Sequence, residues 1–375
     1  MKGHPLLSKF LSCAGWLPTY GLQRVLSARR VSGTRHFIFS VADHFEPYID
    51  PARPRVPVST SEQMQRIRNW CSRYPLVFDS FRDSDGIPFR HTYFYPAECH
   101  DKDIVSVMAE HCHAGWGELE IHLHHGIDNP DTAEHLKHVL IGFRDALAQN
   151  GCLARIPGSD VPRYAFVHGN WALANSARGK FCGVDSEMQI LAETGCYADF
   201  TLPSAPSRGQ VKKINAIYEC FAPLNRRAPH RSGKDLACGC PPKLFPIIVQ
   251  GPLMLNFMER KFKILPALEN SELSAANPPT LNRVKLWERA GIGVRGRPEW
   301  VFMKLHCHAM DPRDSQALLS TPMVNFLQSL AELARSRVVK THFVTAREMT
   351  NIILAACDGK SGNPGAFRDY RLRII

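Results

Sequence analysis

Histidines gather at one point of the sequence, where the run Glu-Leu-Glu-Ile-His-Leu at 118–123 is followed by more polar residues. Besides His122, these are His124, His125 and Asp128. Neutral imidazoles and carboxylates are the usual ligands of a hydrolytic Zn²⁺, which needs three protein ligands and an open position for water. His122 and His124 are two residues apart and point to one side of a strand, whereas His125 points away unless the strand has ended. A single histidine is more often a hydrogen-bonded core or surface residue, but this density predicts a metal or catalytic site.

Two other apolar runs end in the same kinds of side chain. Asp43 and His44 follow one run, and His306 and His308 end another. We interpret Asp43 as a metal ligand, although a helix N-cap is an alternative role for it. His306 and His308 repeat the two-residue spacing, and one of them is a candidate general acid for a leaving group. Cys307 points to the opposite side of a continuous strand, so we do not expect it to act as a nucleophile.

The segment Phe-Val-His-Gly-Asn-Trp at 166–171 carries a different set of groups. His168 supplies a ring, Asn170 an amide, and Trp171 a flat apolar face suited to stacking on a sugar ring. From these groups we expect His168, Asn170 and Trp171, together with His122, to contact a substrate. Ordinary core packing explains Trp171 equally well.

A set of short strands is needed to position these side chains. Apolar runs rich in β-branched and aromatic residues predict eight strands, at 35–42, 89–95, 119–124, 163–168, 196–202, 245–250, 300–306 and 341–345. Helical patterns lie between several of them, at 59–73, 101–114, 131–149, 184–194, 312–335 and 346–356. Ser59 with Glu62, and Thr345 with Glu348, have the spacing of helix capping boxes.

Alternating strands and helices favour a parallel sheet, and eight such units favour a (β/α) barrel. Residues 203–244 and 252–299 are long and weakly periodic, so we expect an α/β fold that is a distorted (β/α) barrel with loop insertions. One catalytic domain is expected at 35–358, between an N-terminal helical segment at 1–34 and a C-terminal tail at 359–375. The candidate residues lie at or just past the carboxyl ends of the predicted strands, where such barrels place their active sites.

The net charge and the cysteine pattern indicate which kinds of binding partner and which compartment to expect. The net charge is +11, but the Lys and Arg residues are dispersed, which favours an anionic or nucleotide-linked sugar or an acidic membrane face over nucleic acid. The 12 cysteines form no zinc-ribbon pattern, which indicates reduced thiols in a cytosol. The N-terminal segment has no 18-residue apolar run, so we expect a helix packed on the barrel or a peripheral membrane anchor helped by Arg24, Arg29 and Arg30. A cytoplasmic protein, membrane-associated at most through this segment, is expected.

Four short patches follow one another in a distinctive order: SVADHFEP at 40–47, HTYFYPAE at 91–98, WGELEIHLH at 116–124 and KLHCH at 304–308. This order resembles the polysaccharide deacetylase family, carbohydrate esterases with a distorted (β/α) barrel and a divalent metal. In that family the corresponding patches are a strand ending in paired aspartates, an A-T-F-F strand, a G-H-E-I-G-S-H segment and a closing L-x-x-H strand. Residues 166–171 stand where the family has its R-x-P segment, which is absent here.

The resemblance spans about residues 35–310 and implies a divalent metal, most simply Zn²⁺. It aligns His124 with the family's first metal-binding histidine and Asp128 with the second, and His125 is an alternative to Asp128. The same alignment leaves the closing histidines, His306 and His308, as proton donors.

The paired aspartates are only half preserved. The family's first aspartate is the general base and its second a metal ligand. Matching them to Ala42-Asp43 keeps the ligand and loses the base, whereas matching them to Asp43-His44 keeps the base and makes His44 the ligand. We take Asp43 as a ligand, assisted by His44 or Glu46, and the identity of the base stays open.

The leading hypothesis is a metal-dependent hydrolase that removes N- or O-acetyl groups from a saccharide, possibly lipid- or nucleotide-linked, in exopolysaccharide biosynthesis. The first alternative is a glycoside hydrolase on a (β/α) barrel, with two carboxylates drawn from Glu46, Glu98, Asp128 and Asp199. The second is a non-catalytic sugar-binding protein of a polysaccharide assembly pathway, suggested by Ala42 in place of the base. Resistance to a chelator separates the first alternative from the metal enzyme.

Overall fold

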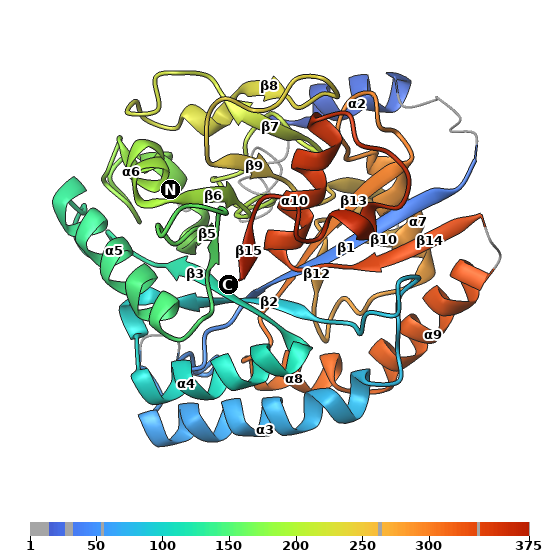
Figure 1. Cartoon of the computed structure of the whole chain (residues 1–375). Coiled ribbons are helices and arrows are strands. Elements are labelled where there is room, and N and C mark those ends of the chain that lie inside the picture. Colours follow the sequence, from blue (N-terminus) through green and yellow to red (C-terminus); the bar gives the residue numbers. More distant parts are fainter. Residues whose placement is uncertain (1–14, 27–32, 54–55, 262–264, 336–337, 375) are drawn as a thin grey trace.

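The computed structural model describes residues 15–26, 33–53, 56–261, 265–335 and 338–374. One large, mostly parallel sheet is flanked by helices (Figure 1). The predicted α/β class is therefore confirmed.

The main sheet has 11 strands in the described part of the chain, in the order β12-β13-β1-β2-β3-β5-β6-β9-β7-β8, and β14 also pairs with β1. The parallel strands are β1 (Arg35–His44), β2 (His91–Pro96), β3 (Gly117–Leu123), β5 (Tyr164–His168), β6 (Cys196–Asp199), β9 (Ile247–Val249), β12 (Glu272–Leu273), β13 (Trp300–Cys307) and β14 (Val339–Phe343). The remaining two are β7 (Ile217–Cys220), antiparallel to β9, and β8 (Gly233–Asp235), antiparallel to β7. All eight predicted strands are present.

Within the described residues, the α-helices are α2 (Leu17–Leu26), α3 (Thr60–Phe78), α4 (Lys102–His111), α5 (Ala133–Gln149), α6 (Glu187–Thr194), α7 (Leu281–Ala290), α8 (Pro312–Leu318), α9 (Thr321–Arg335) and α10 (Ala346–Cys357). Each predicted helical region contains a helix, and the region 312–335 contains two, α8 and α9. Thr345 and Glu348 form the expected capping box, and the Ser59 hydroxyl accepts a hydrogen bond from the Glu62 backbone N–H.

Barrel closure is not observed. The described part of the sheet has two edges, at β12 and β8. The two segments expected to be loops contribute β7, β8, β12 and α7, and also a separate antiparallel pair, β10 (Met254–Lys261) and β11 (Leu265–Glu269). These strands are mostly short, and a two- or three-residue strand carries too few alternations to be detected by period.

The pleat of the sheet divides the core into two layers. Phe37, Phe39 and Val41 of β1 face helices α3, α4 and α9 in one cluster, which we call the outer face. Ile38 and Ala42 of the same strand face the opposite way, which we call the inner face, in a cluster with residues of α10. Figure 1 shows α3 and α4 on one side of β1 and β2 and α10 on the other. Successive residues of a strand thus enter different layers.

Both ends of the described chain pack on this fold. Trp16 is buried in a small cluster with Ile214 and Leu253, next to the start of α2. At the other end, the Asn351 amide donates to the carbonyl oxygens of Arg368 and Leu372, both at 2.7 Å. The rest of the expected N-terminal segment, 1–14 and 27–32 with Arg29 and Arg30, lies outside the described residues.

None of the helices in the described part of the chain is both long and apolar enough to cross a membrane.

Candidate active site

Imidazoles from three strands meet at the carboxyl edge of the inner face. The ring centroid of His44 lies 5.0 Å from that of His122, 6.1 Å from that of His306 and 4.8 Å from that of His308. β1, β3 and β13 run parallel, so their carboxyl ends meet on one edge of the sheet, where open α/β sheets bind ligands. We call the group formed by these rings with Glu46 and His124 the open cluster.

Three side chains of the open cluster converge on one point. Glu46 Oε1 lies 3.4 Å from His122 Nε2 and 3.1 Å from His124 Nε2. One ligand atom of each of these three residues lies within 4.8 Å of the others. His308 approaches the same carboxylate, with Nε2 3.9 Å from Glu46 Oε2. Glu46 is therefore the centre of the cluster.

Hydrogen bonds fix the tautomers of the two converging rings. His122 Nδ1 lies 2.9 Å from the Val167 carbonyl oxygen, and His124 Nδ1 lies 2.7 Å from Glu98 Oε1. A carbonyl oxygen and a carboxylate only accept, so we assign the proton of each ring to Nδ1. Both Nε2 atoms then face Glu46, and His122 Nε2 is buried without a hydrogen-bond partner among the described residues.

The charges of the cluster differ from one side to the other. Burial alone would raise the pKa of Glu46, but the neighbouring rings of His122 and His124 outweigh it and hold that pKa below its usual range. Burial alone would likewise lower the pKa of His124, but Glu46 and Glu98 raise it to about 10. His44 is the reverse case, because burial and the neighbouring His308 lower its pKa well below 6.5. The cluster thus combines an anionic centre at Glu46 and a positively charged ring at His124 with an uncharged ring at His44.

This arrangement fits a divalent metal. Two imidazole Nε2 atoms and one carboxylate form the three-ligand set of a catalytic zinc site, which leaves one position open, and a metal would take the place of the second proton of His124. The Nδ1–H of His124 on Glu98 is the carboxylate–histidine contact that commonly orients a metal ligand. The side chains of His124 and His308 are 14% and 34% exposed, so the cluster is open to solvent on their side.

A pocket next to the cluster offers room for a substrate. Its volume is about 510 Å³, and its lining includes Glu98, His124, Asp131 and His135. The Tyr48 hydroxyl lies 3.5 Å from Glu98 Oε1 and 3.4 Å from His124 Nδ1 at the same place.

Asp43, expected to share a metal with His124, lies in the outer layer. Its Oδ2 lies 3.0 Å from His91 Nδ1, and its Oδ1 accepts the Ala309 backbone N–H at 2.9 Å. Cys307 belongs to the same buried group, as its position opposite His306 and His308 predicted. Asp43 follows the odd-numbered pattern of β1, whereas His44 follows the even-numbered one, so only His44 reaches the open cluster.

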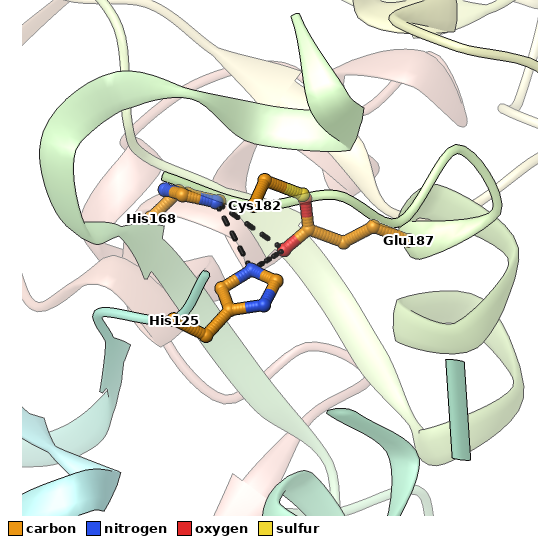
Figure 2. A group of neighbouring side chains, drawn as sticks. All are labelled: His125, His168, Cys182 and Glu187. Atoms are coloured by element: carbon orange, nitrogen blue, oxygen red, sulfur yellow. Dashed lines mark hydrogen bonds and ion pairs between the residues drawn. The ribbon is translucent and has the colours of Figure 1, made fainter. Parts of the chain in front are cut away.

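Several of the other predicted metal ligands and substrate contacts also lie outside the open cluster. His125 and His168 lie in a separate buried group with Cys182 and Glu187, which we call the closed cluster (Figure 2). Asp128 is exposed on the loop after β3. The structure therefore does not bring Asp43, His124, Asp128 and His125 together around one ion, because they alternate between the faces or leave the sheet.

Asn170 and Trp171 form a tight turn after β5. Both have positive φ values, 58° and 55°, and both are half-buried. The carbonyl oxygen of Trp171 would lie 2.4 Å from a Cβ added at Gly209, so the turn is packed against that segment. Asn170 and Trp171 were expected to contact a substrate, and their position in this packed turn does not by itself indicate such a contact.

Sequence reasoning gave Glu46 only an assisting role and placed His122 at the substrate. The usable signal was the spacing His44-x-Glu46, which puts both side chains on the inner face if the extended backbone continues past the strand. Cys182 and Glu187 had no usable signal, because neither lies in a periodic pattern with a histidine.

No protein-family model matches the chain, and no curated protein sequence matches it. Its function must therefore be inferred from the site.

Proposed function

We propose that the protein is a metal-dependent hydrolase whose ligands are Glu46, His122 and His124. The observation that supports this most is the convergence of two imidazole Nε2 atoms on one carboxylate, at the carboxyl edge of a parallel sheet and beside a pocket. A Zn²⁺ ion bound there would polarise a carbonyl group and lower the pKa of a water molecule.

The remaining imidazoles have distinct roles in this proposal. His44 stays uncharged at neutral pH because burial and His308 lower its pKa, so it can accept a proton from the attacking water. His308 is the most exposed imidazole of the open cluster, so it can protonate the departing amine or alcohol. Glu98 orients His124 through Nδ1.

The proposed reaction is removal of an N- or O-acetyl group from a saccharide. Its support is the order of sequence patches that resembles the polysaccharide deacetylases and the position of the open cluster at the ends of β1, β3 and β13. A distorted barrel of that family's type and a cytoplasmic location belong to the same proposal. The ligand set differs from the one the resemblance implied, since Glu46 and His122 replace Asp43 and Asp128.

A glycoside hydrolase remains the second candidate, because two of its candidate carboxylates flank one ring. Glu46 contacts Nε2 of His124 and Glu98 contacts Nδ1. Such an enzyme works through its carboxylates alone and would be unaffected by chelation.

The test is acetate release from acetylated oligosaccharides by the full chain, with and without a chelator, and by the His122→Gln variant. Release that is lost on chelation, restored by zinc and absent in His122→Gln supports the proposal. Acetate release that survives in both cases contradicts it. Chelator-resistant cleavage of the glycosidic bond would transfer the assignment to the second candidate.

A further inference from the structure

The closed cluster lies in the outer layer, next to the open cluster but on the opposite face of the sheet. It combines His125 just after β3, His168 at the end of β5, Cys182 in the following loop and Glu187 at the start of α6. Figure 2 shows the four side chains pointing toward one another. His125 is 5% exposed, and the other three are fully buried.

The polar atoms of the closed cluster are close enough to share one ion. His125 Nε2 lies 3.2 Å from His168 Nε2 and 3.1 Å from Glu187 Oε1. Glu187 Oε1 lies 3.6 Å from His168 Nε2, and Cys182 Sγ lies 3.4 Å from Glu187 Oε2. One ligand atom of each residue lies within 4.8 Å of all the others.

Both imidazoles direct Nε2 to this point. His125 Nδ1 lies 2.8 Å from Asp131 Oδ2, and His168 Nδ1 contacts the Gly169 carbonyl oxygen. These partners only accept, so each Nδ1 carries a proton and each Nε2 is left to face the Glu187 carboxylate. Despite burial, Glu187 and Asp131 raise the pKa of His125 to about 12, which shows that this buried point favours a positive charge, either a proton on Nε2 or a metal ion in its place.

Burial and Glu187 raise the pKa of the Cys182 thiol to about 11, but two backbone donors act in the opposite direction. The backbone N–H groups of Asn175 and Val184 are directed at Sγ, at 3.2 and 3.4 Å. Hydrogen bonds to the charged form favour that form. A coordinated thiol is deprotonated, so these two donors match a metal-bound Cys182.

The loop that carries Cys182 is held in an uncommon conformation. Six non-glycine residues between 170 and 181 have positive φ values, which is rare for residues with a side chain. The loop is bonded to the segment after β3, since Asp131 N donates to the Cys182 carbonyl at 2.7 Å and Phe181 N donates to the Gly126 carbonyl at 2.8 Å. Backbone strain of this kind persists only where the surroundings over-determine it.

From these contacts we propose that His125, His168, Cys182 and Glu187 bind a structural Zn²⁺ ion. Two imidazoles, one thiolate and one carboxylate form a four-ligand set of mixed N, S and O donors, which suits tetrahedral zinc. Four protein ligands in a buried space leave no position for a substrate, so the ion holds structure and does no chemistry. It would fix the 169–186 loop to β5 and α6.

The ion would also support the open cluster. A Cβ added at Gly169 would lie 2.2 Å from His124 Cδ2, so the residue after His168 lies directly against the His124 ring. Anchoring His168 therefore fixes one wall of the neighbouring site.

The competing explanation is a single proton shared between His125 and His168, with no metal. Zinc content of the purified full chain separates the two explanations. We compare the wild type with His122→Gln, which removes a ligand of the open cluster, and with Cys182→Ala. Cys196→Ala is the matched control, because Cys196 is an equally buried thiol outside the cluster.

The expected result is one zinc ion per chain in His122→Gln, a loss of one ion in Cys182→Ala, and no loss in Cys196→Ala. X-ray absorption of zinc in His122→Gln, where the closed cluster is intact, should show one sulfur neighbour at about 2.3 Å together with nitrogen and oxygen neighbours. This measurement stands even if Cys182→Ala does not fold.

A zinc-free His122→Gln protein, or zinc with no sulfur neighbour, would overturn the inference. If the wild type holds a single zinc ion that depends on Cys182 and not on His122, the closed site stands and the proposed hydrolase site fails. The two proposals can therefore fail separately.

Discussion

The open and closed clusters share one edge of the sheet, and the consecutive residues His124 and His125 belong one to each. His124 continues the inner-face pattern of β3 and contacts Glu46, whereas His125 enters the outer layer and contacts Glu187. The open cluster has three converging candidate ligands and a solvent-exposed side. The closed cluster has four candidate ligands, one of them a thiol, and all are buried. Two consecutive residues, His124 and His125, thus belong to two different kinds of candidate site, one with the features of a catalytic metal site and the other with those of a structural metal site.

In both clusters, hydrogen bonds from Nδ1 orient the imidazole rings. In each, one ring donates Nδ1–H to a carboxylate, from Glu98 or Asp131, and the other donates to a carbonyl oxygen. The number of ligands and the access of water, rather than the orientation of the rings, distinguish the two. Variants that affect one cluster and leave the other intact test this distinction.

Loss of a ligand from the open cluster should have the largest effect, and it should fall on activity. His122→Gln is expected to reduce hydrolysis by about a thousandfold or more, because the metal supplies several kcal/mol of transition-state stabilisation. The thermal midpoint measured by calorimetry should change little, because glutamine can still donate to the Val167 carbonyl. A fall in midpoint as large as that of Cys182→Ala would contradict the division into catalytic and structural sites.

Neutralising the carboxylate at the centre of each cluster should lower the free energy of unfolding by different amounts. Glu187→Gln is expected to lower the free energy of unfolding by about 3 kcal/mol, because it removes one partner from a buried charged group. Glu46→Gln is the matched control and should cost about 1 kcal/mol, since Glu98 still pairs with His124 near solvent. Urea unfolding of both variants measures the difference. Equal losses would show that Glu187 has no special structural role.

The carboxylates behind the imidazoles should tune metal affinity at one cluster each. Glu98→Gln is expected to weaken zinc binding at the open cluster about 10–100-fold, and Asp131→Asn should do the same at the closed cluster. Competition with a chromophoric chelator measures both affinities in each variant. If either substitution weakened both sites, the clusters would have to be treated as one coupled centre.

The smallest expected effect is a pH dependence from His306, an imidazole of the open cluster. Burial, Lys304 and His308 lower its pKa well below 6.5 in the folded chain, so below pH 6.5 the unfolded chain binds the proton first. Stability is therefore lost as the pH falls from 6.5 toward the folded pKa, by at most about 1.4 kcal/mol per pH unit.

His306→Gln should remove about 1 kcal/mol of this loss between pH 7 and pH 5.5. Chemical denaturation at the two pH values measures it. The exposed His138→Gln is the control and should leave the pH dependence as it is in the wild type. An unchanged slope in His306→Gln would mean that His306 is already accessible to protons in the folded chain.

The eight strands and the parallel order of most of them could be predicted, because long apolar runs separated by helical patterns are a local property of the chain. Alternation also predicted that His122 and His124 share a side and that Cys307 does not join His306. The assignment of Asp43 was wrong because it followed the resemblance, which placed that residue at a metal with His124, whereas the alternation of β1 points it to the outer face.

The sequence by itself determined the strands, the concentration of histidines at their carboxyl ends and the side of the sheet to which each histidine belongs. These depend on a period of two residues, which is local. Only the tertiary structure decided which carboxylate and thiol complete each set of ligands. Glu46 meets His122 across 76 positions and Glu187 meets His125 across 62, and such contacts depend on how strands and loops pack rather than on spacing along the chain.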